Sequence, residues 1–137
     1  MAIIEKIEHN KKTLALIIRK KDHPKKIGAN FITKNTDPFQ LGFINYPTNH
    51  KIKPHFHKNR KRIINTCTEV LIVKEGILDV YFYKKNGKKI NIKKKLKKGD
   101  ILLLLQGGHG FKVSKKISLI EIKQGPYSVN KDKKIIK

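Results

Sequence analysis

The stretch TEVLIVKEGILDVYFYKKNGKKINIKKKLKKGDILLLLQ, residues 68–106, contains four short apolar segments separated by turn residues. The segments cover residues 68–76, 77–85, 88–96 and 100–106. Asn86-Gly87 is a residue pair that tight β-hairpins prefer, and Gly76 and Gly99-Asp100 provide further turn signals. Short segments at this spacing, with no long helical pattern, predict consecutive antiparallel strands.

The same pattern extends in both directions from this stretch. Residues 13–20, 39–46 and 52–57 upstream and residues 118–124 downstream are predicted as further strands, with Gly107-Gly108 as another turn. Residues 1–12 are expected to form a short helical or irregular lead-in, and residues 128–137 a frayed tail. The expected fold class is all-β, an antiparallel barrel or sandwich.

Length and composition favour one domain, residues 1–137, with one small core. The chain has 137 residues, of which 38% are hydrophobic. No apolar run approaches the roughly 20 residues that a membrane-spanning helix needs, and the first residues do not resemble a signal peptide. Cys67 is the single cysteine, which excludes an internal disulfide framework. We therefore expect a cytoplasmic protein with no membrane association.

The formal net charge of +23 raises nucleic acid as a partner. However, only Arg19, Arg60 and Arg62 are arginines, and the lysines are spread along almost every segment. Base readout and bidentate phosphate recognition favour arginine, so the pattern argues against specific nucleic-acid binding. An anionic small-molecule substrate is compatible with the same charge.

Histidines and a carboxylate recur at spacings that suit a binding site. On a strand over residues 52–57, His55 and His57 would share a face because side chains alternate. Glu69 opens the next predicted strand, and His109 follows the Gly107-Gly108 turn. If these strands pair, three imidazoles and one carboxylate converge, which is a natural site for a divalent transition metal.

The sequence resembles the cupins, small β-barrel proteins with two characteristic motifs. His55 and His57 match the His-x-His of the first motif, and Glu69 followed by Gly76 matches its second half. Asn49 replaces the leading glycine, and eleven residues separate His57 from Glu69, where the motif has three or four.

In the second motif, Gly99 and Gly107 match, Leu105 replaces the proline, and His109 comes one residue early. GDILLLLQGGHGF and IEIKQGPY are further similar to small cupins that accompany genes for surface polysaccharide and nucleotide-sugar synthesis.

This resemblance implies a cupin jelly roll, with its core at about residues 39–125, that forms a homodimer through outer strands. It also implies an isomerase or epimerase acting on a sugar or nucleotide-sugar, in which histidines often work as acid–base groups without a metal. The catalytic candidates are then His55, His57, Glu121 and Tyr46.

Several alternatives remain open for these residues. His55, His57, Glu69 and His109 would bind one iron, nickel, manganese, zinc or copper ion, or the histidines would act in proton transfer, or they would be structural. Glu69 is either a ligand or a carboxylate paired with a lysine, and Cys67 is more typical of a small buried hydrophobe.

The sequence also offers candidate residues for binding an anionic substrate, and two other classes of function. The candidates for holding an anionic substrate are Arg60, Arg62 and Lys123, and Gln40 and Asn45 are further polar positions on predicted strands. A non-catalytic metal- or small-molecule-binding module is the alternative function, and a lysine-rich nucleic-acid binder is a third hypothesis.

Overall fold

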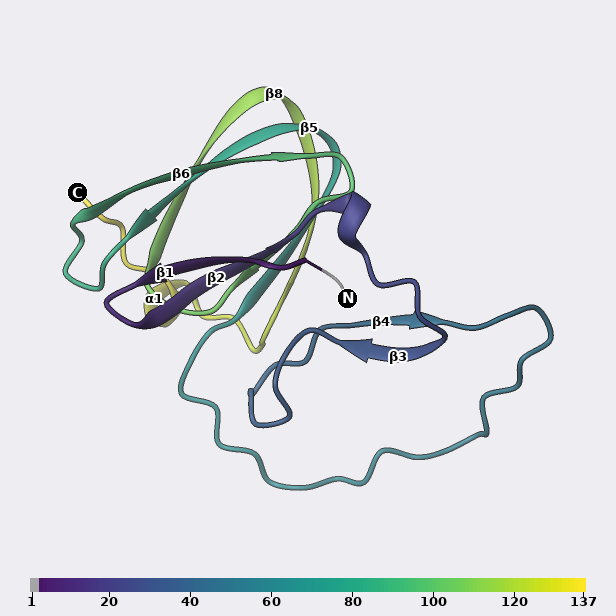
Figure 1. Cartoon of the computed structure of the whole chain (residues 1–137). Helices are drawn as coiled ribbons and strands as arrows, with labels where there is room; N and C mark the ends of the chain where they lie inside the picture. The colour runs from purple at the N-terminus through teal and green to yellow at the C-terminus, as the bar shows by residue number, and fades with distance from the viewer. Residues whose placement is uncertain (1–2) are drawn as a thin grey trace. The chain divides into compact units, whose positions relative to one another are not determined.

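The computed structural model describes residues 3–137, with about 47% of the chain in strands and 5% in helices (Figure 1). The strands are antiparallel wherever they pair, which confirms the predicted all-β class. The elements are β1 (Glu5–His9), β2 (Lys12–Ile18), η1 (Lys20–Asp22), β3 (Gly28–Phe31), β4 (Gly42–Asn45), β5 (Glu69–Tyr83), β6 (Lys89–Lys97), β7 (Ile101–Leu104), β8 (Gly108–Lys123) and α1 (Val129–Asp132).

The chain divides into two compact units. The larger unit comprises residues 3–22 and 66–137, and the smaller unit comprises residues 23–65. The larger unit holds a six-stranded sheet in the order β1-β2-β7-β5-β6, with β8 paired to β5. Among the described residues β1 and β6 are the two ends of this strand order and β8 is a further edge strand beside β5, and no ladder of hydrogen bonds joins the two ends into a closed barrel.

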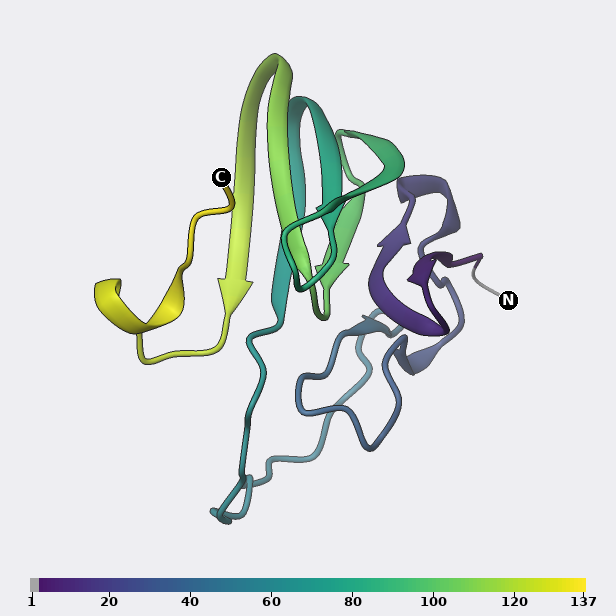
Figure 2. The same ribbon diagram turned by 90° about the vertical axis from the view of Figure 1, so that its left-hand side faces the viewer.

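The strand β5 organises the larger unit because it pairs on both edges. Its first residues, from Glu69 to Ile72, pair with β7, and its second half pairs with β6. Along most of its length it also pairs with β8, and Figures 1 and 2 show these two strands bending together. The predicted strands 68–76 and 77–85 are therefore one strand, so the turn predicted at Gly76 was wrong.

Gly76 is a bulge within β5 rather than a turn. Its φ is +92°, and the register with β8 shifts on both sides of it. Before the bulge, Leu71 and Val73 point into the core, and after it Leu78 and Val80 do so. The bulge thus inserts the extra residue that keeps both halves of β5 facing one core while the strand bends.

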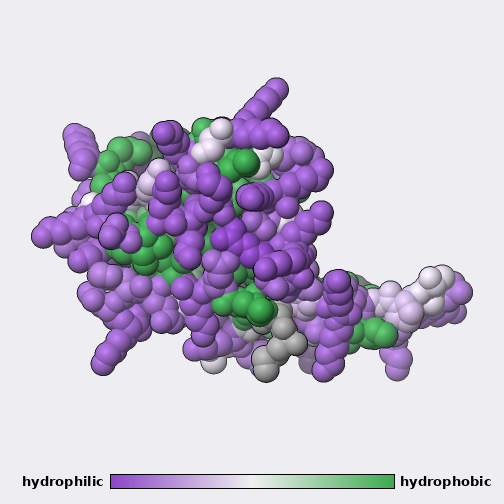
Figure 3. All heavy atoms as spheres, turned by 45° about the horizontal axis from the view of Figure 1, so that its top comes forward, coloured by the Kyte–Doolittle hydropathy of each residue, from purple (hydrophilic) through white to green (hydrophobic). Residues whose placement is uncertain are grey.

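Hydrophilic side chains predominate on the face of the molecule that Figure 3 shows, with hydrophobic groups visible between them. The chain carries 33 lysines and arginines against 10 aspartates and glutamates, so most of these polar groups are cations. Their spread over many segments agrees with lysines that serve as ordinary surface residues.

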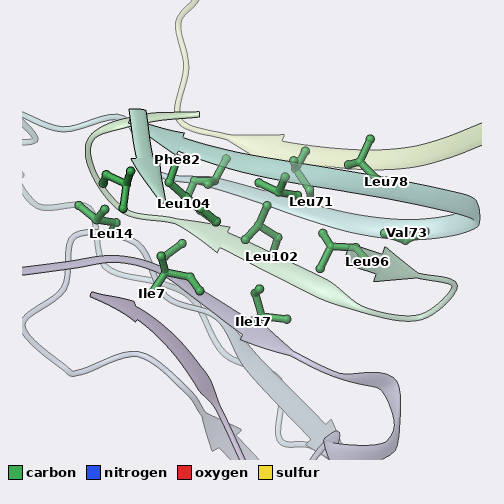
Figure 4. Packing of buried hydrophobic residues seen from close by; sticks show 13 residues of the cluster. Ile7, Leu14, Ile17, Leu71, Val73, Leu78, Phe82, Leu96, Leu102 and Leu104 are labelled. Carbon is green, nitrogen blue, oxygen red and sulfur yellow. The ribbon is translucent and has the colours of Figure 1, made fainter. Parts of the chain in front are cut away.

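The core fills the space between the two ends of the sheet (Figure 4). Ile7 and Ile17 from β1 and β2 face residues of β5 and β6 across this space, and Leu102 of β7 lies beside Ile17 in the sheet. The cluster contains Ile7, Leu14, Ala15, Ile17, Leu71, Val73, Leu78, Val80, Phe82, Ile90, Leu96, Leu102 and Leu104. Residues 5–9, expected as part of a helical or irregular lead-in, form β1 because Ile7 covers this core, and residues 1–2 of that lead-in lie outside the described residues.

Two predicted turns are confirmed. In the β5–β6 hairpin, Lys84 N–H donates to Lys88 O and Gly87 N–H donates to Lys84 O, with Gly87 at a φ of +85°. In the turn between β6 and β7, Gly99 has a φ of +88° and Asp100 N–H donates to Lys97 O. The expected frayed tail begins with the short helix α1, and residues 133–137 follow without regular structure.

A network around Arg19 links the two ends of the sheet in the larger unit. The Arg19 guanidinium donates to Glu5 on β1 at 2.5 Å, to the carbonyl oxygen of Lys95 on β6 at 2.6 Å and to Asp100 at 2.9 Å. Lys94 on β6 pairs with Glu5 at 3.4 Å. The hydrogen bond from Arg19, assisted by its charge, lowers the pKa of Glu5.

Replacing Arg19 with methionine is expected to lower the free energy of unfolding by about 2–3 kcal/mol, because Asp100 is buried and would lose its charged partner. The pKa of Glu5 is lower in the folded state than in the unfolded state. This difference stabilises the fold at pH values above the pKa of the unfolded state, and the stabilisation is lost as the pH falls through the pKa of the folded state. Urea unfolding at several pH values should therefore show that the difference in the free energy of unfolding between wild type and Arg19→Met becomes smaller in acid.

The exposed pair between Lys98 and Glu75 provides the matched control for this substitution. Its side chains are 62% and 65% exposed, so Lys98→Gln should leave the free energy of unfolding nearly unchanged. An equal loss in both variants would show that the Arg19 network has no special role.

The smaller unit is built on the two-stranded sheet β3–β4, of which only β4 lies in a predicted strand. Gln40 and Asn45, which were candidates for a pocket, donate instead to backbone carbonyls of the same unit, at Lys34, Asp37 and Pro24. These two amides therefore stabilise the loops of the smaller unit.

The strand predicted over residues 52–57 is absent. All of residues 46–68 are described, and none lies in a strand. Pro47 and Pro54 each remove a backbone donor, and the basic run that follows Pro54 disfavours close pairing. Asn49 does adopt the left-handed backbone expected of a glycine replacement, with a φ of +67°.

Candidate functional site

The candidate site lies in the larger unit, where three ionisable side chains share one face of β5 and β8, two of them largely buried and Glu121 exposed. Glu69 opens β5 on the same face as Leu71 and Val73, as the strand period predicted. Glu121 near the end of β8 is the register partner of Leu71, so it shares that face. His109 near the start of β8 is the register partner of Phe82, which is also a core residue.

The bend of the sheet brings the two ends of β8 to the same carboxylate. Nε2 of His109 lies 3.6 Å from Oε2 of Glu69, although His109 pairs with the opposite end of β5. The side chains are 29% and 15% exposed, so both are largely withdrawn from water while remaining reachable. Glu69 and His109 are therefore in contact, and their membership of one functional site stays a prediction.

The protonation equilibria of Glu69 and His109 shift in opposite directions. Burial raises the pKa of Glu69, and the charge of Glu121 and a hydrogen bond to it raise this pKa further. Burial lowers the pKa of His109, an effect that the charge of Glu121 opposes. The causes of the His109 pKa shift are burial and the charges of Glu121 and Lys133, although the imidazole touches Glu69.

Basic and aromatic side chains surround these three residues. Lys123 is the register partner of Glu69, and its Nζ lies 4.9 Å from the centre of the Tyr127 ring. The charges of Lys123 and Lys133 lower the pKa of Glu69 against the larger opposing effects. The ring of Phe111 lies 5.3 Å from that of His109 and is 42% exposed. The site thus offers cations and an apolar ring beside its ionisable groups.

A hydrogen bond joins Thr68 to Gln124 at the end of this site where β5 begins. Thr68 is buried, and its backbone N–H donates to Oε1 of Gln124 at 2.8 Å. Nε2 of Gln124 is buried and has no hydrogen-bond partner within residues 3–137. An unsatisfied buried donor of this kind is uncommon and marks the end of β8 as a place where a ligand atom would be stabilised.

Cys67 lies at the same end of β5, and it is exposed rather than buried as its residue type suggested. Partial burial of the thiol raises its pKa, and the charge of Glu69 raises it further.

We expect slower alkylation of Cys67 by iodoacetamide at pH 8 than for an unstructured cysteine peptide, and a faster rate in Glu69→Gln. Glu75→Gln, which changes a remote exposed carboxylate, serves as the control; an unchanged rate in Glu69→Gln would contradict the electrostatic coupling.

The remaining predicted residues belong to the smaller unit. The site prediction required His55 and His57 to lie on a strand, and this part was wrong, since both are exposed in the segment without strands. The centres of their rings lie 5.2 Å apart, and Nδ1 of His55 lies 2.8 Å from the carbonyl oxygen of Lys53. Arg60 and Arg62 are exposed in the same segment, and Tyr46 stacks on His50.

The four predicted metal ligands are divided between the units. His55 and His57 belong to residues 23–65, whereas Glu69 and His109 belong to the larger unit. Among residues 3–137, no three His, Cys, Asp or Glu side chains are arranged to hold a metal ion. The four-ligand metal centre therefore stays a prediction.

Three residues of the site were not identified from the sequence. Phe111 shares the strand parity of His109, so it could have been found by extending the predicted strand 118–124 back to residue 108. Gln124 directly follows β8, and its contact with Thr68 depends on the pairing of β5 with β8. Lys133 carries no local signal, because it reaches the site only through the path of the chain after β8.

Comparison with known protein families, with characterised proteins and with solved structures finds no match to this chain. Within residues 3–137, no helix has the length and apolar character that crossing a membrane requires. We therefore infer the function from the site itself.

Proposed function

We propose that the larger unit is a cupin-type jelly roll that catalyses proton transfer on a sugar. The bent antiparallel sheet supports this fold, as do the turn at Gly99 and the position of His109 directly after a glycine turn. The contact between Glu69 and His109, with pKa values shifted toward each other, is the observation that carries the proposed reaction.

Isomerisation next to a ketone needs one group that accepts a proton and one that donates a proton. The neutral imidazole of His109 takes the proton from the carbon beside the carbonyl, while protonated Glu69 donates to the carbonyl oxygen, giving an enediol. To move the carbonyl, the imidazolium gives its proton to the former carbonyl carbon, while the Glu69 carboxylate takes the proton of the other enediol hydroxyl. To invert the original carbon, that carbon takes a proton from water on its opposite face, the Glu69 carboxylate takes back the proton it gave to the oxygen, and the imidazolium releases its proton to water. Glu121 raises the protonated fraction of Glu69 and hence the supply of the acid.

The surroundings of the site suit an anionic carbohydrate. Lys123 and Lys133 provide positive charge, and the exposed ring of Phe111 can pack against the apolar face of a sugar. A sugar linked to a nucleotide has both properties, so nucleotide-sugars are the first substrates to test. Arg60 and Arg62 remain predicted contacts to such an anion, and the cytoplasm and a homodimer remain the proposed location and assembly.

The test is incubation of the protein with a panel of nucleotide-linked keto sugars in deuterated water, followed by proton NMR. Loss of the signal from a proton beside the ketone, with appearance of an isomer or epimer, is the expected result. Wild-type protein that exchanges no proton on any keto sugar, free or nucleotide-linked, would contradict proton-transfer chemistry and favour a non-catalytic binding module.

Metal binding is the second candidate, and it is supported by the same contact, because Glu69 and His109 would supply two of the ligands. The metal would be one iron, nickel, manganese, zinc or copper ion. Elemental analysis of untagged protein purified without chelator should find about one equivalent of one metal, and His109→Ala should lose it. Wild-type protein that stays empty after addition of these ions would exclude this candidate.

A further inference from the structure

A lysine-lined cleft lies in the larger unit between the β5–β6 turn, the Gly107-Gly108 turn and residues 134–137. Its volume is about 850 Å³. A smaller hollow of about 310 Å³ shares the lining residues Lys84, Lys85, Asn86 and Gly107 with it. Of the described residues that line the two hollows, none is Glu69, His109 or Glu121, although Gly108 and Lys134 adjoin the site residues His109 and Lys133 in the sequence.

The charge of this cleft is unbalanced. Five lysines line the larger hollow, the smaller one adds Lys12, and no aspartate or glutamate among the described residues lines either. None of these lysines forms an ion pair within residues 3–137. The lysines of the larger hollow are Lys84, Lys85, Lys88, Lys134 and Lys137.

A second basic hollow in the same unit shows that lysine content alone does not create this imbalance. The hollow beside Arg19 is lined by six basic and three acidic residues. Two of its acids, Glu5 and Asp100, are held by the Arg19 guanidinium, and Asp100 also accepts from the backbone of Lys20 and Lys97. In the described part of the chain, no aspartate or glutamate lines the cleft beside residues 134–137 to balance its lysines in this way.

Glycines on two turns allow the tail to form a wall of the cleft. A Cβ on Gly108 would lie 2.6 Å from Cδ1 of Ile136, and one on Gly87 would lie 3.5 Å from its Cγ2. Ile136 therefore packs where both turns lack a side chain, which brings Lys134 and Lys137 to line the same hollow as the hairpin lysines. Lysines from two segments far apart in the sequence can thus contact one small anion.

We propose that this cleft binds a small, multiply charged phosphate anion of the pyrophosphate type. Lysine ammonium groups act as compact point charges with three donors each, and several around one cleft match an anion whose charge is spread over many oxygens. The binding does not depend on the sugar reaction, because the lysines of the cleft are not residues of the candidate site.

The test is isothermal titration of the full chain with inorganic pyrophosphate at constant ionic strength. We expect saturable binding at one site, weakened about tenfold or more in the triple variant Lys84→Gln/Lys85→Gln/Lys88→Gln. The matched control, Lys20→Gln/Lys21→Gln/Lys97→Gln, removes the same charge from the Arg19 hollow and should change the affinity by less than about twofold.

Equal weakening in both triple variants would overturn the proposal, since the anion would then respond only to net charge. Absence of saturable binding to the wild type would overturn it too. Amide NMR of the wild-type protein decides the question if a variant fails to fold. Pyrophosphate should shift the signals of Gly87, Gly107 and Gly108 and leave that of Gly28 in place, and the reverse pattern would contradict the cleft.

Discussion

Replacing Gly76 with alanine is expected to destabilise the larger unit by about 3 kcal/mol or more. Two effects act together at this position. The φ of +92° is one that side-chain-bearing residues rarely adopt, and a Cβ there would collide with the carbonyl oxygen of Lys116 on β8 and lie 2.7 Å from that of Lys115. Relief would require β5 and β8 to separate at the bulge that keeps Val73 and Leu78 in one core.

Urea unfolding followed by circular dichroism measures this effect. Gly110→Ala is the matched control, because Gly110 also lies in a strand and its Cβ would meet only the Tyr83 ring, at 3.5 Å. The control should lose less than about 1 kcal/mol. Similar stability of Gly76→Ala and wild type would show that β5 does not pass through a bulge at residue 76.

Loss of either member of the Glu69–His109 pair is expected to lower the proton-transfer rate by about 10²–10⁴-fold. The variants are Glu69→Gln and His109→Asn, which approximately preserve the size of each side chain and remove its acid–base function. Turnover of the keto sugar identified by NMR is the measurement. Glu75→Gln, which removes an exposed carboxylate paired with Lys98, should retain wild-type turnover.

The pH profile separates the two roles. Activity should fall in acid as His109 becomes protonated, and the lowered pKa of His109 extends activity below the usual range of an imidazole. Activity should fall in base as Glu69 loses its proton, and the raised pKa of Glu69 moves this limb upward from the usual carboxyl range. Glu69→Gln should remove the basic limb, and His109→Asn the acidic one.

Stability distinguishes a catalytic role for Glu69 from a structural one. Because the folded pKa of Glu69 is raised, the folded state favours the protonated carboxyl, and this contribution to stability is lost as the pH rises through the folded pKa. Glu69→Gln should therefore have a higher free energy of unfolding than wild type at neutral pH. This advantage over wild type should disappear in acid, below the pKa that Glu69 has in the unfolded state. A variant that loses both activity and stability at neutral pH would contradict the proposed environment.

Much of the strand pattern could be read from local sequence. The apolar segments at residues 13–20, 88–96 and 100–106 overlap β2, β6 and β7 respectively, and Asn86-Gly87 and Gly99 form the expected turns. These features depend on side-chain alternation and on backbone conformations that glycine and asparagine favour, both of which act within a few residues. Gly76 misled the prediction because a glycine bulge and a glycine turn have the same local sequence.

The site was predicted in part for the same reason. Glu69, His109 and Glu121 were each candidates from the sequence, but the partnership with Glu121 was not predicted. The predicted partners of Glu69 included His55 and His57, through a strand that prolines and a basic run prevent. The partner found in the larger unit is Glu121, because β5 pairs with β8 along most of its length.

The antiparallel β class, the turns and the parity that directs Glu69 toward the core could all be inferred from the residues alone, since each follows from short-range backbone geometry. The contact of His109 with Glu69, the pKa shifts that burial and Glu121 cause, and the lysines that Ile136 places around a cleft could not. These features depend on how far β5 and β8 bend and on which distant segments pair. Pairing and bending result from the packing of the whole core, which no single segment encodes.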